Sequence, residues 1–335
     1  MYTTGTPDLM SNGRASRLLS RIDGDFARAA EEVSTGLKSD PVKASGGDPI
    51  RLYALERDLT LNETRRVNLD AAAARAGATQ TALSKLETAT GAIGGALMGA
   101  ITIGDMTSAE LHAGKARGAF GDAVGALNAR YGDRTLFAGA ATDGAALAGA
   151  DRMLAEIAAR VAPATGAADV IAAVDDYFSD PAGFAATGYL GSLTDAAAAE
   201  TGDGERVGYA IRADRAEITD ALKALALGVI GAEGGYAGAT RGDRMEVMRE
   251  AAGRGLNAIA GVVALRGEVG VSEERLELAG LRIGAERSFL QQSRNAVIAA
   301  DPYEAGVAFT ALQAQLETAL NVTARLSSLS LAKYL

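Results

Sequence analysis

Apolar or small residues recur at heptad spacing near both ends of this chain of 335 residues. Near the N-terminus the spacing is 4, 3, 4, 3, 4, and near the C-terminus it is 3, 4, 3, 4, 3. Such a run lies on one stripe of an α-helix, and another helix must cover that stripe. The two stripes therefore predict terminal helices that meet each other. Their members are Ala15, Leu19, Ile22, Phe26, Ala29 and Val33 at one end, and Phe309, Leu312, Leu316, Ala319, Thr323 and Leu326 at the other.

Loop and cap signals set the inner limits of both stripes. Residues 34–49 hold three glycines and two prolines, which predicts a loop after the first helix. At the other end, Asp301 precedes Pro302, a pair that predicts a new helix with Asp301 as its N-cap and Pro302 as its first residue. We expect an N-terminal assembly helix over residues 1–36 and a C-terminal assembly helix over residues 301–335.

Helical patterns fill most of the sequence between these ends. Long helices are expected at about 50–91 and 241–300. A shorter helix is expected at about 108–129, with Thr107 or Ser108 as its cap, and helical pattern resumes at about residue 214. Alanine-rich sequence with only 6 prolines favours helix throughout these segments.

The middle of the chain, residues 131–212, is more irregular. Two short helices are expected at "DRMLAEIAARV" and "AADVIAAVDDYF", and a strand at "ERVGYAIRA" after the turn "TGDG". The expected fold class is mainly α: an elongated antiparallel bundle of long helices built from both chain ends, with a small irregular α+β domain inserted in the middle. In this scheme residues 37–130 and 213–300 form the inner bundle, and 131–212 the inserted domain.

Composition excludes several classes of function. A formal net charge of −9 argues against nucleic acid as the main partner, because phosphate binding needs clustered Lys and Arg. The absence of cysteine excludes disulfides and thiolate chemistry. The longest uncharged run, residues 88–104, is short and rich in glycine, so we expect a buried helix there and no membrane span. The N-terminus shows no pattern of a cleavable signal peptide.

Residues suited to catalysis are sparse. The single histidine, His112, lies in a predicted helix and is expected to be a surface or packing residue. We expect no catalytic, cofactor-binding or metal-binding residues and no cofactor. Two pairs of adjacent acids, at 175–176 and 273–274, point about 100° apart on a helix and so do not share a site unaided. An enzyme with a carboxylate pair in the middle region remains an alternative.

Three segments resemble the flagellin superfamily. "EVSTGLKSDPVKASGGDP" (32–49) has an S-T-G turn that ends one helix and a D-P that begins the next. The tail "LSLAKYL" (329–335) resembles the S-L-L-x-Y-L ending of the hook-associated protein 3 family, which forms the hook–filament junction. "ALRGEVGVSEERLE" (264–277) is similar to the C-terminal pattern R-x-x-[LV]-G-x-x-x-x-R-L-E, with matches at Arg266, Val269, Gly270, Arg275, Leu276 and Glu277.

The resemblance implies an exported structural protein of the bacterial flagellum that passes unfolded through the type III export channel. It implies an extracellular place at the hook–filament junction, as an adaptor between hook-associated protein 1 and the flagellin filament. The implied partners are these two proteins, further copies of the chain in a ring or tube, and a cytoplasmic export chaperone that binds the C-terminal region. Flagellin itself, the filament subunit, is the alternative within the superfamily.

The terminal helices are the expected assembly surface. Because each has one apolar stripe and little else to cover it within one subunit, we expect the stripes to be wet in the free chain and buried between copies. The expected subunit-assembly residues are Leu19, Ile22, Phe26, Val33, Phe309, Leu312, Leu316, Leu326, Leu329, Leu331 and Leu335.

Overall fold

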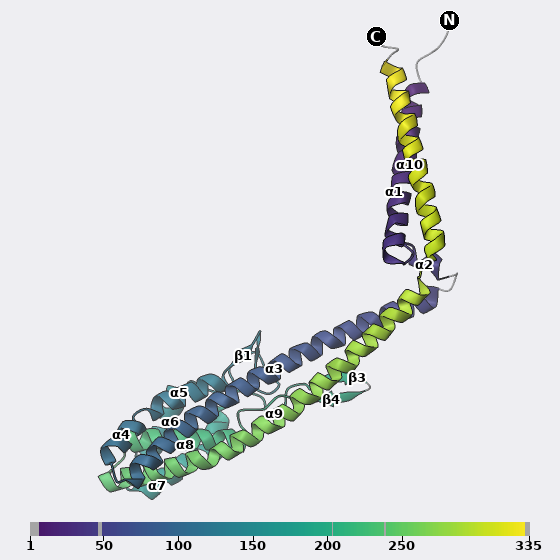
Figure 1. Cartoon of the computed structure of the whole chain (residues 1–335). Coiled ribbons are helices and arrows are strands. Elements are labelled where there is room, and N and C mark those ends of the chain that lie inside the picture. The colour runs from purple at the N-terminus through teal and green to yellow at the C-terminus, as the bar shows by residue number, and fades with distance from the viewer. Residues whose placement is uncertain (1–6, 46–48, 203, 238, 332–335) are drawn as a thin grey trace. The chain divides into compact units, whose positions relative to one another are not determined.

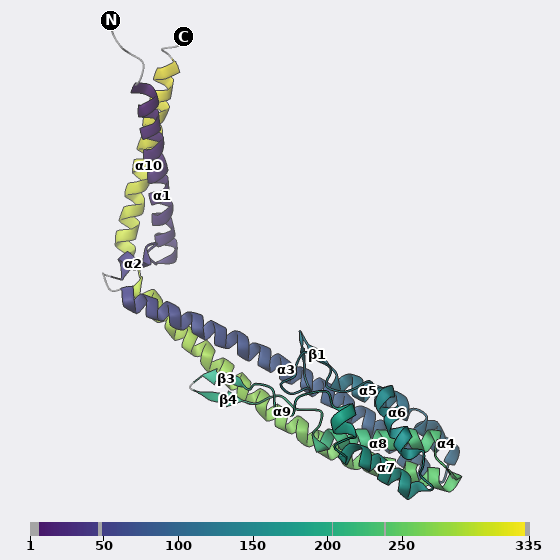
Figure 2. The same cartoon turned by 180° about the vertical axis from the view of Figure 1, so that it is seen from behind.

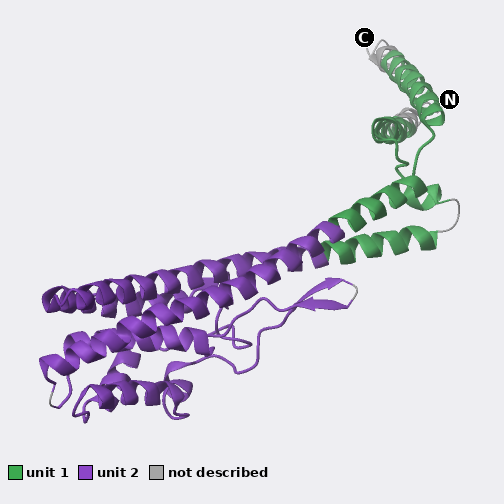
Figure 3. Cartoon of the chain, turned by 60° about the horizontal axis from the view of Figure 1, so that its bottom comes forward, with its two compact units in different colours: residues 1–64, 284–335 green, residues 65–283 purple. Residues whose placement is uncertain are grey.

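The computed structural model describes residues 7–45, 49–202, 204–237 and 239–331. The chain divides into two compact units (Figure 3). Unit 1 consists of residues 1–64 and 284–335, and unit 2 of residues 65–283. Two long helices, α3 (Pro49–Thr102) and α9 (Arg241–Val297), contribute residues to both units.

Unit 1 is built from the two ends of the chain. It contains α1 (Pro7–Thr35), the short α2 (Pro41–Ala44) and α10 (Pro302–Leu331), together with the first turns of α3 and the last turns of α9. Polar contacts join α3 to α9 here: Asn62 Nδ2 donates to a Glu286 carboxylate oxygen at 3.0 Å, and Arg287 pairs with Glu63 at 2.8 Å.

Unit 2 is a helical bundle around α8 (Ala216–Glu233). Every residue of α8 from Ala224 to Gly231 is buried, so this helix is covered on all sides, as its continuous apolar sequence predicts. It packs against α4, α5, α6 and α7. The bounds of those helices are Met106–Ala113 for α4, Ala116–Leu127 for α5, Ala150–Val161 for α6 and Ala167–Ser179 for α7.

Within unit 2, α3 and α9 approach closely because both carry glycine at the crossing. A Cβ built on Gly94 would lie 3.3 Å from the backbone nitrogen of Leu256, and one built on Gly255 would lie 3.4 Å from Gly94 Cα. Further along, Gln80 Nε2 donates to the Arg266 carbonyl at 2.7 Å, while Arg266 itself pairs with Glu87 at 2.6 Å. Backbone contact and side-chain clamp together hold the two long helices side by side.

Short strands and loops join the helices of unit 2. Strands β1 (Arg130–Tyr131) and β2 (Arg134–Thr135) form one antiparallel hairpin, and β3 (Ala199–Gly202) and β4 (Glu205–Val207) form another. A π-helical turn, η1, spans Phe184–Gly188. The β3–β4 register shifts between Glu200 and Gly202, so that hairpin contains an irregularity.

The predicted mainly α fold of packed long helices is confirmed, and the predicted start of the last helix is exact. The Asp301 carboxylate accepts hydrogen bonds from the backbone nitrogens of Tyr303, at 2.8 Å, and Glu304, at 3.1 Å. The two short helices expected in the middle region are α6 and α7.

One helix prediction is wrong. Residues 108–129 do not form one helix, because the chain breaks at Gly114 and Lys115 into α4 and α5. The cap is also different: the Asp105 carboxylate accepts from the Ser108 backbone nitrogen at 3.1 Å, in place of a Thr107 or Ser108 cap. Ala113 and Ala116, on either side of the break, are both fully buried.

The uncharged run 88–104 continues α3 to Thr102, well beyond the expected end near residue 91. Its apolar side chains, including Ile93 and Leu97, are buried in the core of unit 2. Among the helices that the structure describes, none has the length and hydropathy needed to cross a membrane.

Candidate assembly surface

The two terminal helices pair with each other in unit 1. Figures 1 and 2 show α1 and α10 side by side and antiparallel, with the start of α1 and the end of α10 at the same end of the pair. The rings of Phe26 and Phe309 stack across this pair, with centroids 5.0 Å apart and an interplanar angle of 26°. The predicted stripes therefore meet within a single chain.

This pairing changes one expectation about the free subunit. We expected the stripes to be exposed to water in the free chain, but they are half-buried against each other. The loops at the inner ends of α1 and α10 place the two helices antiparallel, so that their stripes face each other. The half-buried predicted residues are Leu19, Ile22, Phe26, Phe309, Leu312 and Leu316. Their predicted role in contacts between subunits is a separate matter and stays a prediction.

The remaining predicted residues are placed differently. Val33 is at the surface, with 49% of its area exposed. Leu326, Leu329 and Leu331 belong to α10, but their side chains lie outside the described part of the chain. Leu335 lies beyond the described residues altogether.

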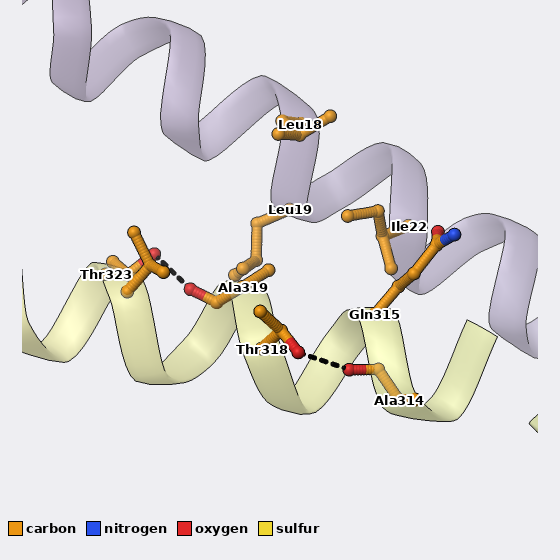
Figure 4. Close-up of a pocket in the computed structure, with 9 residues that line it drawn as sticks. Leu18, Leu19, Ile22, Ala314, Gln315, Thr318, Ala319 and Thr323 are labelled. Atoms are coloured by element: carbon orange, nitrogen blue, oxygen red, sulfur yellow. Dashed lines mark hydrogen bonds between the residues drawn. The ribbon is translucent and has the colours of Figure 1, made fainter. Parts of the chain in front are cut away.

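A hollow of about 470 Å³ lies between the paired helices (Figure 4). Leu18, Leu19 and Ile22 line it from α1, and α10 contributes mainly alanines and threonines. The hydroxyls of Thr318 and Thr323 donate to the carbonyls of Ala314 and Ala319 in their own helix, so they face the hollow without a free donor (Figure 4). The small side chains of α10 leave this apolar hollow unfilled in the single chain.

The outer surface of α10 is apolar as well, which the heptad pattern did not reveal. Tyr303 is 80% exposed and Val307 is 54% exposed, and both line a shallow apolar depression on the helix. Leu320 is also about half exposed, and so is Val322, which lines the hollow between the two helices. Only Glu304, Glu317 and Arg325 carry charge in the 30 residues of α10. This scarcity of charge is the sequence signal that could have found the surface.

The partner helix, α1, is much more highly charged than α10. Charged residues occur along most of the length of α1, with Arg17, Arg21, Asp23, Asp25 and Arg28 among them. A helix with one apolar stripe and a charged back is typical of a surface helix, whereas a helix with almost no charge on any side is typical of a buried one. The exposed surface of α10 is therefore much less charged than that of α1.

A short backbone bridge fixes the base of the pair. Gly36 adopts a positive φ of 68°, which turns the chain directly after α1. The Lys38 nitrogen then donates to the Ile298 carbonyl at 2.8 Å, and the Ala300 nitrogen donates to the Gly36 carbonyl at 2.9 Å. These bonds hold the ends of α1 and α9 together next to the start of α10.

Glu32 stabilises the same turn. Its carboxylate accepts from the backbone nitrogen of Ser39 at 2.8 Å and from the Ser39 hydroxyl at 2.7 Å. These two hydrogen bonds, with Lys38 and Arg28 nearby, lower the pKa of Glu32 below its ordinary 4.5. A lowered folded-state pKa means that the stabilisation is complete above pH 4.5 and is lost as the pH falls through the folded pKa.

We therefore expect the Glu32 carboxyl to titrate below 4.5 in the folded chain, and the turn at Ser39 to loosen in acid. Carbon-detected NMR of the carboxyl gives the pKa, and the Ser39 amide shift should follow the same titration. In Glu32→Gln the amide should show no such step. A Glu32 pKa at or above 4.5 would contradict the assigned hydrogen bonds.

The segment that resembles the flagellin C-terminal pattern has a clear structural role in unit 2. Arg266 clamps α9 onto α3 through Gln80 and Glu87, and Val269 and Leu276 are buried in the core between helices. The acid pair at 175–176 is also structural. Asp175 pairs with Arg254 of α9, and Asp176 pairs with Arg160 of α6 at 2.7 Å, so the two carboxylates serve different contacts.

The family model of the bacterial flagellin C-terminal helical region matches residues 256–335. The C-terminal arm is thus similar to that of bacterial flagellins. This arm comprises most of α9 and all of α10, and the match confirms the predicted resemblance to the flagellin superfamily. It supports a structural component of the bacterial flagellum.

The comparisons with curated proteins and solved structures add little to the match of the C-terminal arm. No curated protein matches the chain in sequence. A solved structure described as a flagellar hook-associated protein from Vibrio parahaemolyticus is 12% identical, with 76% of this chain and 97% of that chain covered and a TM-score of 0.45. At that score the two folds are not shown to be the same.

Proposed function

We propose that this chain is a structural subunit at the hook–filament junction of a bacterial flagellum, which assembles through its terminal helices. The match of residues 256–335 to the flagellin C-terminal helical region supports the flagellar part of the proposal. The proposed assembly segments are residues 1–36 and 301–335, which contain α1 and α10.

The observation that carries the proposal is the surface of α10. After its pairing with α1, this helix still exposes Tyr303, Val307, Leu320 and Val322, and it has three charges in 30 residues. Full burial of an exposed apolar side chain contributes about 1.5–3 kcal/mol, and covering one that is already half-buried contributes roughly half of that. Neighbouring copies that cover this face would gain that stabilisation several times over. Repeated contacts between unlike surfaces give rings or helical tubes.

The proposed partners follow from that arrangement. One end of such a ring would meet hook-associated protein 1 and the other the flagellin filament. Before export, an apolar C-terminal region needs protection from aggregation, which fits a cytoplasmic chaperone bound to it. The chain would pass unfolded through the flagellar type III channel, without cleavage of a signal peptide, to an extracellular position in the flagellum.

Flagellin is the second candidate, favoured by the fact that the matching family model describes flagellins. The two candidates differ in where the subunit is found. A chromosomal deletion complemented with an epitope-labelled chain separates them by immunogold electron microscopy. We expect hooks without filaments in the deletion strain, and label confined to a short band between hook and filament after complementation. Label along the whole filament would favour flagellin, and normal flagella in the deletion strain would contradict both.

A further inference from the structure

A pocket of about 540 Å³ in unit 2 is lined by an excess of arginine. It lies between α3, the β1–β2 hairpin and the segment that includes β3 and β4. Four arginines and one glutamate line it: Arg65, Arg75, Arg134, Arg206 and Glu200. The rest of the wall comprises alanines of α3 and of residues 197–199, the amide of Asn68 and the ring of Tyr209.

Most of this positive charge has no partner. Arg206 pairs with Glu200 at 2.9 Å. In the described part of the chain, neither Arg65, which is partly buried, nor Arg134, which is exposed, has a carboxylate within ion-pair distance. Arg75 donates from Nη1 to the Tyr209 hydroxyl at 3.3 Å, and its Nε is buried with no acceptor. Three guanidinium groups therefore lack a counter-charge.

This arrangement contrasts with two partly buried arginines elsewhere in unit 2. Arg160 is held by Asp176 and Asp180, and Arg254 by Asp175 and Glu250. The chain as a whole carries a net charge of −9, so acidic side chains are plentiful. The guanidinium groups of Arg65 and Arg134 line the pocket without a counter-charge from the described residues, and they point to an anionic ligand that supplies one.

We propose that this pocket binds a phosphorylated small molecule of about the size of a sugar phosphate. Guanidinium groups bind phosphate through paired N–H donors, and a phosphate dianion offsets most of the excess charge of three arginines. The volume is in the range of small-molecule sites. The alanines and the Tyr209 ring form an apolar wall for the body of the ligand, and the Asn68 amide offers hydrogen bonds to hydroxyl groups.

Isothermal titration calorimetry on the full chain with glucose 1-phosphate tests the proposal. Binding should weaken as salt is raised. Arg65→Gln and Arg134→Gln should each weaken it about tenfold or more, because each removes a charge-assisted hydrogen bond. Arg152→Gln is the matched control: it removes an exposed arginine of α6 that does not line the pocket, and affinity should not change. Circular dichroism verifies that every variant is folded.

Two further probes define the ligand class. Inorganic phosphate should bind more weakly than glucose 1-phosphate if the apolar wall contributes, and glucuronate should bind more weakly if the dianion matters. Equal affinity for glucuronate and glucose 1-phosphate would overturn the assignment to phosphate. Absence of binding, or equal affinity in Arg65→Gln and Arg152→Gln, would overturn the site itself.

Discussion

Val307→Asp should abolish incorporation of the chain into flagella while it leaves the free subunit folded. Val307 is 54% exposed on α10, so an aspartate at this position remains hydrated in the free chain and should change its stability by less than about 0.5 kcal/mol. In an assembly that covers the same face, the charge would be buried without a partner, at a cost of several kcal/mol. Motility on soft agar and electron microscopy of sheared flagella measure incorporation, and thermal unfolding measures stability.

Two companion variants make the comparison decisive. Phe309→Asp places the charge in the stack with Phe26, so it should separate the terminal helices already in the free chain, with a measurable loss of helix signal. Ala159→Asp adds the same charge to an exposed position of α6, outside the proposed assembly segments, and should be tolerated. Motile cells with Val307→Asp as their sole copy would show that the apolar face of α10 is not covered in the flagellum.

Local signals in the sequence predicted the helices that have clear ends. Asp301 and Pro302 define the start of α10 through a cap and a fixed φ, both of which are properties of the residues themselves. The break between α4 and α5 was missed although Gly114, a residue type common at helix ends, lies at it. Ala113 and Ala116 are three residues apart and both buried, so the apolar pattern continues across the break and does not mark it.

The same limit applies to the assembly surface. Heptad spacing predicted which side chains of α1 and α10 share a stripe, but a stripe does not specify whether its partner is in the same chain or another. The stack of Phe26 on Phe309 answers that for the free chain. The arginine pocket was beyond sequence reasoning, because Arg65, Arg134 and Arg206 are far apart along the chain and only the fold brings them together.

Gly94→Val should destabilise unit 2 by about 1–3 kcal/mol, because overpacking a close contact forces neighbouring groups apart. A Cβ at Gly94 would already lie 3.3 Å from the Leu256 nitrogen and 3.4 Å from the Ala252 carbonyl oxygen. Both are backbone atoms of α9, so they cannot move aside as the end of a flexible side chain can. The γ-methyl groups of valine would push the two long helices apart and strain the Arg266 clamp. Urea unfolding followed by circular dichroism measures the loss.

The next residue supplies the control. Gly95 is exposed on the same helix, and a Cβ at that position would meet nothing within 4 Å. Gly95→Val should therefore be neutral or slightly stabilising, since valine is a somewhat better helix former than glycine. A difference of at least 1 kcal/mol between the two variants measures the tightness of the α3–α9 crossing, because helix propensity is the same in both. If the two variants unfold at the same urea concentration, the glycines do not set the distance between these helices, and the close contact at Gly94 and Gly255 is not what holds unit 2 together.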